Sequence, residues 1–235
     1  MNYQEIQREL IKLGNPQIAK HTQRFFKTAK GEYGYGDIFL GIRVPIIRKH
    51  VQKYRDISIE ICIKLLKSKY HEIRLFALLA MVSKYSKGSY IQKQNIFNLY
   101  LENTKHINNW DLIDTSAHHI VGNYLTNKDK SILIKLARSK SLWERRIAII
   151  ATFEFIKNYN FNPTLEIAEM LICDQEDLIH KAVGWMLREI GKKDLSTEIE
   201  FLNKHYQKMP RTMLRYAIEK FPEIERQKYL DKTYY

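Results

Sequence analysis

The sequence has little cysteine and no long hydrophobic run. Cys62 and Cys173 are its two cysteines, and neither has a partner at Cys-x-x-Cys spacing, which excludes a disulfide framework and a zinc ribbon. The longest apolar stretch, IAIIATF from Ile147, is far too short to cross a bilayer. The N-terminal MNYQEIQREL lacks the apolar segment of a signal peptide. We therefore expect a soluble, unprocessed, cytoplasmic protein that does not enter membranes.

Acidic residues are scarce relative to basic ones. Lys and Arg number 39 against 26 Asp and Glu, so the formal net charge is +13. This balance favours a polyanionic partner, with nucleic acid as the first candidate. An AT-rich genome would also enrich a protein in lysine, so the charge becomes informative only if the cations line one face.

Motifs for metal and acyl-transfer chemistry are missing. His118 and His119 are adjacent rather than four residues apart, and neither His-Glu-x-x-His nor Gly-x-Ser-x-Gly occurs, so we expect no metal and no serine nucleophile. The glycines of KGEYGYGD, from Gly31 onward, follow no predicted strand and precede no Gly-Lys-Ser/Thr. They indicate a mobile turn rather than a phosphate-binding loop.

Apolar residues recur at spacings of three and four almost throughout, as in Ile59, Ile63 and Leu66, with no sustained alternation. The chain is therefore predicted to be all-α. The breaks between helices are short, and none is long enough for a linker, so we expect residues 1–235 to form a single domain. These breaks are Asn15-Pro16, residues 31–41, Lys87-Gly88, Asn127-Lys128, Asn162-Pro163, Gly191 and Pro210.

A basic residue followed by small and apolar positions recurs along the chain. It begins RLFALLA at Arg74, RIAIIAT at Arg146, KAVGWML at Lys181 and RYAIEK at Arg215, at intervals of 72, 35 and 34 residues. The position halfway between Arg74 and Arg146 is Trp110, so the run WDLIDTSA takes the place of the missing repeat. A period near 35 is typical of one helix pair per repeat, so it predicts a right-handed superhelical solenoid of HEAT-like antiparallel helix pairs with a concave basic groove.

The candidate site in that groove combines a carboxylate with two indoles. Trp110 and Asp114 lie four residues apart in NNWDLIDTSA, so they share one helix face. Stacked repeats would place Arg146 and Trp185 on the same concave surface as Asp114. Each residue alone also has an ordinary structural explanation on an amphipathic helix. His118 continues the stripe, but a single histidine there is more often a surface or capping group than a base.

Further cations are candidates for contact with DNA. Arg43 and Arg48 flank the start of a helix in GIRVPIIRKH, where we expect Pro45 as the first helical residue. Lys181 opens the run KAVGWML. The alternative for these cations is a solvated helix edge. Asp111, directly after Trp110, is expected to face away from the site.

Five runs, FLGIRVPIIRK, NNWDLIDTSA, LWERRIAI, HKAVGWMLREIGK and MPRTMLRYAIEKFP, resemble in this order the AlkD family of DNA alkylation repair glycosylases, which are HEAT-like helical solenoids. By this resemblance, Trp110, Asp114 and Trp185 match the residues around the deoxyribose of the lesion, and Arg146 matches an arginine that contacts DNA. The resemblance implies a monofunctional alkylpurine DNA glycosylase of base excision repair, without a cofactor. It also implies that the lesion is handled without a deep base pocket. A monomer suits a groove that must admit a duplex.

These residue types suit that reaction. Breaking an N-glycosidic bond places positive charge on the deoxyribose. A carboxylate about 4 Å away, at an effective dielectric of about 20, attracts that charge by about 4 kcal/mol, or roughly a thousandfold in rate. No strong general acid accompanies Asp114. The expected substrates are therefore purines alkylated at N3 or N7, which are already cationic.

Two other classes of function stay open. A non-catalytic HEAT-repeat protein that binds damaged or branched DNA would show salt-sensitive binding without base release. A protein-interaction scaffold built from the same repeats would not need its cations on one concave face.

Overall fold

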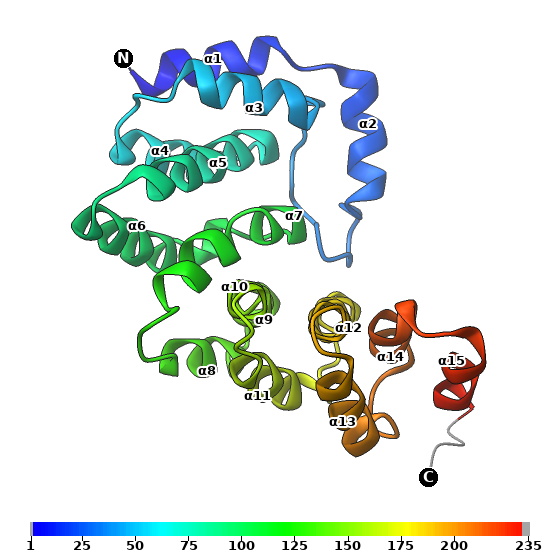
Figure 1. Cartoon of the computed structure of the whole chain (residues 1–235). Helices are drawn as coiled ribbons and strands as arrows, with labels where there is room; N and C mark the ends of the chain where they lie inside the picture. The colour runs from blue at the N-terminus through cyan, green and yellow to red at the C-terminus, as the bar shows by residue number, and fades with distance from the viewer. Residues whose placement is uncertain (1, 232–235) are drawn as a thin grey trace. The chain divides into compact units, whose positions relative to one another are not determined.

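The computed structural model describes residues 2–231 and is helical nearly throughout (Figure 1). Within these residues no strand forms, and Ile38 and Tyr70 make one isolated bridge. The predicted all-α fold is therefore confirmed. In the same part of the chain, no helix has the length and apolar character needed to cross a membrane. Two compact units divide the chain, Met1–Ser116 and Ala117–Tyr235. The single domain stays a prediction, because a solenoid also divides into locally contacting parts.

The first unit is built around one long buried helix, α5 (His71–Lys87). It packs against α3, α4, α6 and α7. All residues from 71 to 81 of α5 are buried, which is typical of a helix surrounded by others. The other helices of the unit are α1 (Tyr3–Lys12), α2 (Pro16–Phe25), α3 (Val44–Lys53), α4 (Ile59–Leu66), α6 (Tyr90–Glu102) and α7 (Trp110–Asp114), with a 3-10 turn at Thr104–His106.

The second unit has a similar central helix, α12 (Asp177–Gly191), which packs against α9, α11, α13 and α14. Gly184 lies where α12 and α14 approach closely, since a Cβ there would be 2.3 Å from the Met213 carbonyl oxygen. The unit starts with a π-helical turn, η2 (His118–Gly122). The remaining helices are α8 (Ser131–Ala137), α9 (Leu142–Ala151), α10 (Phe153–Lys157), α11 (Asn162–Leu171), α13 (Leu195–His205), α14 (Arg211–Ala217) and α15 (Glu223–Leu230), with a 3-10 turn at Ile218–Lys220.

Most predicted breaks coincide with helix ends. The Asn15 side chain accepts from two backbone N–H groups and caps α2, which starts at Pro16, and Gly191 ends α12. Pro45 is the second residue of α3 rather than the first, because Val44 before it already has helical geometry. The sequence analysis missed the connection across residues 103–109, which separates α6 from α7.

The sequence repeat marks one layer of helices in each unit. Arg74 lies in α5 and Trp110 starts α7, and these two helices contact each other. In the second unit, Arg146 lies in α9, Lys181 in α12 and Arg215 in α14, and α12 contacts both of the others. The positions spaced near 35 residues apart therefore fall on helices that contact one another within each unit.

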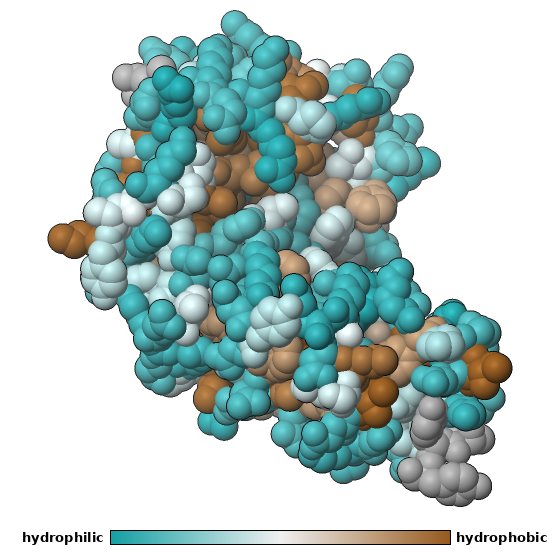
Figure 2. Space-filling view, viewed as in Figure 1, coloured by the Kyte–Doolittle hydropathy of each residue, from teal (hydrophilic) through white to brown (hydrophobic). Residues whose placement is uncertain are grey.

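Hydrophilic residues cover most of the face seen in Figure 2, and hydrophobic residues show as smaller areas between them. Several large apolar side chains of the first unit are nevertheless exposed around the loop between α2 and α3. They are Phe25, Tyr35, Ile38, Val44 and Ile46.

Candidate functional site

Trp110 and Asp114 lie one helical turn apart on α7, and both are half-buried. The helix is only five residues long. Its start is fixed by Asn109, whose Oδ1 accepts a hydrogen bond of 2.9 Å from the Trp110 backbone N–H. A helix this short gains little from its own backbone hydrogen bonds. Its orientation therefore depends on what its side chains contact.

Two phenylalanines at the end of α2 surround the indole of Trp110. The Phe26 ring stacks on it at 5.1 Å between centroids and 11° between planes. The Phe25 ring meets it edge-on at 6.0 Å and is 61% exposed. Phe26 thus packs against one face of the indole, and Phe25 adds an edge-on contact. The sequence analysis missed both phenylalanines, because nothing local links residues 25 and 26 to residue 110.

The Asp114 carboxylate lies within electrostatic range of a buried phenol. Burial, and in addition the charge of Asp114, raise the pKa of Tyr100. The Tyr100 hydroxyl is 2.9 Å from the Ser116 Oγ, and both groups are buried. The phenol is therefore neutral at physiological pH and adds no second negative charge near the carboxylate.

A buried charged cluster that the sequence analysis missed lies directly behind α7. His71 has Nδ1 3.2 Å from the Asp37 Oδ2 and Nε2 2.8 Å from the Asp111 Oδ2. Asp37 also accepts hydrogen bonds of 2.6 Å from the Arg74 Nη2 and 3.0 Å from the Asn109 Nδ2. The prediction that Asp111 faces away from the site agrees with its bond to His71. The cluster combines two carboxylates with two cationic side chains.

Mutual attraction shifts the pKa values within this cluster. Burial alone would raise the pKa of Asp37, but the hydrogen bond from His71, the charge of Arg74 and the hydrogen bond from Asn109 lower it to about 2. Burial alone would lower the pKa of His71, but the charge and hydrogen bond of Asp111 and the hydrogen bond to Asp37 raise it to about 9. His71 is therefore an imidazolium at neutral pH, paired on both sides.

Glu72, next to His71, holds the end of the glycine-containing loop. Its carboxylate accepts hydrogen bonds from the backbone N–H groups of Leu40, Gly41 and Ile42, at 2.8, 2.7 and 3.2 Å. Gly41 has a positive φ of 79°, and a Cβ there would be 2.2 Å from the Asn15 carbonyl oxygen. The predicted turn is present, and the mobile turn expected from its glycines is tied down at its C-terminal end.

Trp185 and Arg146 lie in the second unit, on α12 and α9, which pack together. Trp185 is half-buried, and its Nε1–H donates to the Glu189 Oε1 at 3.0 Å. Arg146 is only 5% exposed, and its Nη1 donates to the Leu178 carbonyl oxygen. Its predicted contact with DNA stays a prediction. Arg145 pairs instead with Asp174 at 2.6 Å, so the two neighbouring arginines point in different directions, as expected.

His118 is part of an aromatic group next to Trp185. Its ring is 5.3 Å from the ring of Phe153, which in turn is 6.1 Å from Trp185. Burial and the charges of His119 and Lys157 lower the pKa of His118 to about 3, so the ring is neutral at physiological pH. The π-helical turn η2 packs on α9 and α10 and half-buries the ring, and the expectation that His118 is a surface or capping group rather than a base stays a prediction.

The three other cations predicted to contact DNA differ in their surroundings. Arg43 and Arg48 are exposed, and among residues 2–231 neither guanidinium has a hydrogen bond or an ion pair. Lys181 pairs with Asp177 at 2.8 Å, one turn before it on α12. The DNA-contact role of all three stays a prediction.

The four central residues fall into two pairs. Trp110 and Asp114 belong to the first unit, and Arg146 and Trp185 belong to the second. The structure brings the members of each pair onto one helix or onto packed helices. Convergence of the two pairs at one groove stays a prediction.

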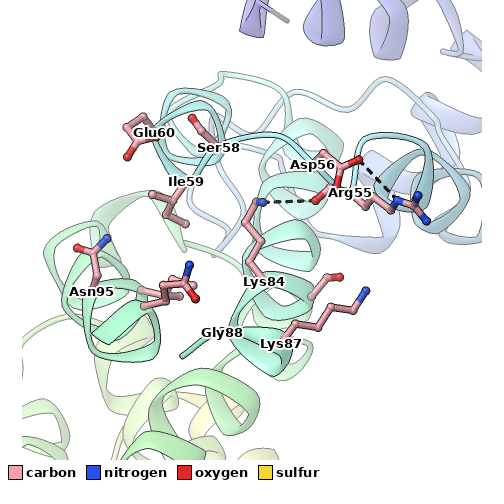
Figure 3. Close-up of a pocket in the computed structure, with 12 residues that line it drawn as sticks. Arg55, Asp56, Ser58, Ile59, Glu60, Lys84, Lys87, Gly88 and Asn95 are labelled. Carbon is pink, nitrogen blue, oxygen red and sulfur yellow. Dashed lines mark hydrogen bonds and ion pairs between the residues drawn. The ribbon is translucent and has the colours of Figure 1, made fainter. Parts of the chain in front are cut away.

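A separate cavity of about 660 Å³ lies in the first unit, between the turn after α3, the end of α5 and the start of α6 (Figure 3). Arg55, Lys84 and Lys87 supply positive charge, but Asp56 and Glu60 lie at the same cavity. Lys84 already donates to the Arg55 carbonyl oxygen at 3.3 Å. None of its lining residues is aromatic, so it offers no stacking surface for a base. Within residues 2–231, no group of three or more His, Cys, Asp or Glu side chains is placed to hold a metal ion.

Comparison with known proteins gives a consistent result. Residues 6–221 match the family described as DNA alkylation repair enzyme. A solved structure described as a predicted DNA alkylation repair enzyme from Enterococcus faecalis is similar in fold, with a TM-score of 0.68 and 15% identity, over 89% of this chain and 97% of that chain. At that identity the likeness establishes the fold alone. No curated protein matches the sequence.

Proposed function

Because the chain belongs to the DNA alkylation repair enzyme family, we propose that it is a DNA glycosylase that releases N3- or N7-alkylated purines from duplex DNA. The observation that carries the proposal is a half-buried carboxylate, Asp114, one helical turn from the half-buried indole of Trp110. Cleavage of the N-glycosidic bond leaves positive charge on the deoxyribose, and these two groups are suited to stabilise it. The role assigned to Asp114 is electrostatic stabilisation of that sugar cation and orientation of the attacking water.

The indoles have a second role in this proposal. We assign the face of Trp110 opposite Phe26 to contact with a cationic nucleoside, while Phe26 packs against the ring. We assign to Trp185 the exclusion of water from the nucleoside. Each indole would contribute about 1–2 kcal/mol. Arg146 would hold a phosphate of the same strand.

The proposal assigns no proton donor to the leaving base, and this sets the expected substrate. His118, the histidine nearest Trp185 through Phe153, is neutral because its pKa is lowered to about 3. It therefore has no proton to give to a leaving base at neutral pH. Purines alkylated at N3 or N7 carry a positive charge and leave without protonation, whereas neutral lesions need an acid. The proposed site favours the cationic lesions.

The proposed DNA surface includes exposed groups of the first unit. Arg43 and Arg48 are exposed cations on α3 and at its cap, where they can contact phosphates. Phe25, 61% exposed and edge-on to Trp110, offers an apolar contact to a base or sugar. Cations beside exposed aromatic rings are typical of nucleic-acid surfaces.

A base-release assay with matched variants tests the proposal. Duplexes carrying 7-methylguanine or 3-methyladenine should lose the free base, and duplexes carrying the neutral lesion 1,N6-ethenoadenine should not. Asp114→Asn should slow release roughly a thousandfold. The matched control is Asp56→Asn, because the Asp56 side chain is 92% exposed and lies in the same unit.

If Asp114→Asn releases the base at the rate of the Asp56→Asn control, the role proposed for the Asp114 carboxylate is wrong. Salt-sensitive binding of the duplex without any base release would instead favour the non-catalytic DNA-binding alternative.

A further inference from the structure

The buried cluster behind α7 has no place in the chemistry assigned above. His71 is 1% exposed, and Asp37 and Asn109 are buried with it. These three residues are too buried to contact a substrate. Each is linked to a residue that flanks Trp110 or to a ring that contacts it.

The geometry requires His71 to carry two protons. Its Nδ1 and Nε2 each lie within hydrogen-bonding distance of a carboxylate oxygen, at 3.2 and 2.8 Å. An ionised carboxylate can only accept, so both ring nitrogens must donate. A neutral imidazole would satisfy one of the two carboxylates and leave the other without its donor. The ring therefore joins Asp37 to Asp111 only as an imidazolium.

Three routes lead from this imidazolium to Trp110. The first is Asp111, the next residue in the chain, which accepts from the His71 Nε2. The second passes through Asp37 to Asn109, whose Nδ2 donates to Asp37 and whose Oδ1 accepts from the Trp110 backbone N–H. The third is Phe26, whose ring centroid is 5.1 Å from the rings of both His71 and Trp110.

We propose that His71 is a positioning residue that fixes the indole of Trp110 and, one turn further along α7, the carboxylate of Asp114. It acts through Asp111, Asn109 and Phe26 and touches no substrate. The kinetic part of this inference rests on the proposed glycosylase function, whereas its structural part concerns the setting of Trp110 and does not.

Fluorescence tests the structural part. Trp110 is the one tryptophan of the first unit, so Trp143→Phe/Trp185→Phe makes it the sole reporter. In that background, His71→Gln should shift the Trp110 emission maximum and intensity. The matched control is His106→Gln, a half-buried histidine of the same unit with no carboxylate partner among the described residues. It should leave Trp110 emission unchanged.

A pH titration separates positioning from general packing. The charged groups that face His71 are Asp37 from the loop, Asp111 from α7 and Arg74 from α5. As the pH rises through about 9, His71 should lose its second proton, and Trp110 emission should change with the same midpoint. The change should be absent in His71→Gln.

Kinetics test the rest, with Trp143 and Trp185 intact. His71→Gln should slow single-turnover base release about 10- to 100-fold, the range expected for a small misplacement of reacting groups. Its Kd for the duplex should stay within about threefold of the wild type, because the exposed cations are untouched. If the protein releases no base at all, the proposed function fails, and the fluorescence still decides the positioning of Trp110.

A second variant covers the case in which His71→Gln does not fold. Asp111→Asn keeps the shape of the side chain but removes the charge that favours the second proton on His71. It should alter Trp110 emission and move the pH midpoint below that of the wild type. Emission and base release in His71→Gln or Asp111→Asn equal to those of His106→Gln would overturn the inference.

Discussion

Trp110 and Trp185 are held in different ways in the two units. Trp110 starts a helix of five residues whose flanking side chains bond to a buried charged cluster. Trp185 lies inside a helix of 15 residues that packs against several neighbouring helices, and its indole N–H bonds to Glu189 one turn away on the same helix. The first tryptophan depends on non-local polar contacts, and the second depends on its own helix.

This difference predicts different sensitivity to substitution. Hydrophobic packing along a long helix is spread over many residues, so the loss of one polar contact changes little. A buried cluster of paired charges is sensitive, because removing one partner leaves another charge buried and uncompensated. We therefore expect single polar substitutions to disturb α7 more than α12.

The largest expected effect is that of Asp37→Ala. It removes the carboxylate that accepts from Arg74, His71 and Asn109, and it leaves two cationic side chains buried side by side. The free energy of unfolding should fall by about 3–5 kcal/mol. Urea unfolding followed by Trp110 fluorescence measures it. Glu200→Ala, which breaks an exposed pair with Lys204 in the second unit, should leave the free energy of unfolding almost unchanged. Equal costs would contradict the comparison.

The next effect is a pH dependence that arises from His71 in the first unit. The pKa of His71 is raised from 6.5 to about 9, so the imidazolium stabilises the folded state fully below pH 6.5, and this contribution is lost as the pH rises to about 9. The stability difference between wild type and His71→Gln should shrink by on the order of 2–4 kcal/mol between pH 6 and 9.5. The lowered pKa of Asp37, about 2, affects only acid pH. A difference that stays constant over this range would contradict the charged state of His71.

Packing rather than charge is the sensitive feature of α12. Gly184→Ala would place a Cβ 2.3 Å from the Met213 carbonyl oxygen and force α12 and α14 apart. We expect a loss of about 1–3 kcal/mol in unfolding free energy, measured by urea. Gly31→Ala is a contrasting control with space around its Cβ, where the cost comes from its positive φ of 87° alone. An unchanged stability in Gly184→Ala would show that the two helices separate easily.

The smallest effect is expected for Glu189→Ala. It removes the acceptor of the Trp185 indole N–H, but the ring stays on a helix packed by its neighbours. The cost should be about 0.5–1.5 kcal/mol, and base release should stay within a few-fold of the wild type. Urea unfolding and the release assay measure these. A loss as large as that of Asp37→Ala would mean that Trp185 also depends on its polar partner.

Much of the fold could be predicted from the sequence. Apolar spacing identified the helices, and Asn15, Lys87 and Gly191 marked helix ends that the structure confirms. The recurrence near 35 residues identified the helices that stack in each unit. The short connection at residues 103–109 was missed, because its polar residues form no proline or glycine signal.

The candidate site was predicted only in part. Trp110 and Asp114 were paired correctly on one helix, because a spacing of four is a local property. The buried charged cluster next to them could not be predicted, since His71 and Asp111 are 40 residues apart in the sequence and Asp37 and Asn109 are 72 apart. Phe25 and Phe26 were missed for the same reason.

The sequence by itself determined the helices, their stacking period and the family, because each depends on spacing along the chain or on matching runs of residues. Tertiary structure alone decided which buried charges surround α7, that His71 is held as an imidazolium, and that His118 is neutral. The protonation state of a side chain depends on the charges and burial around it. Those are set by loops and helices that meet from distant parts of the chain.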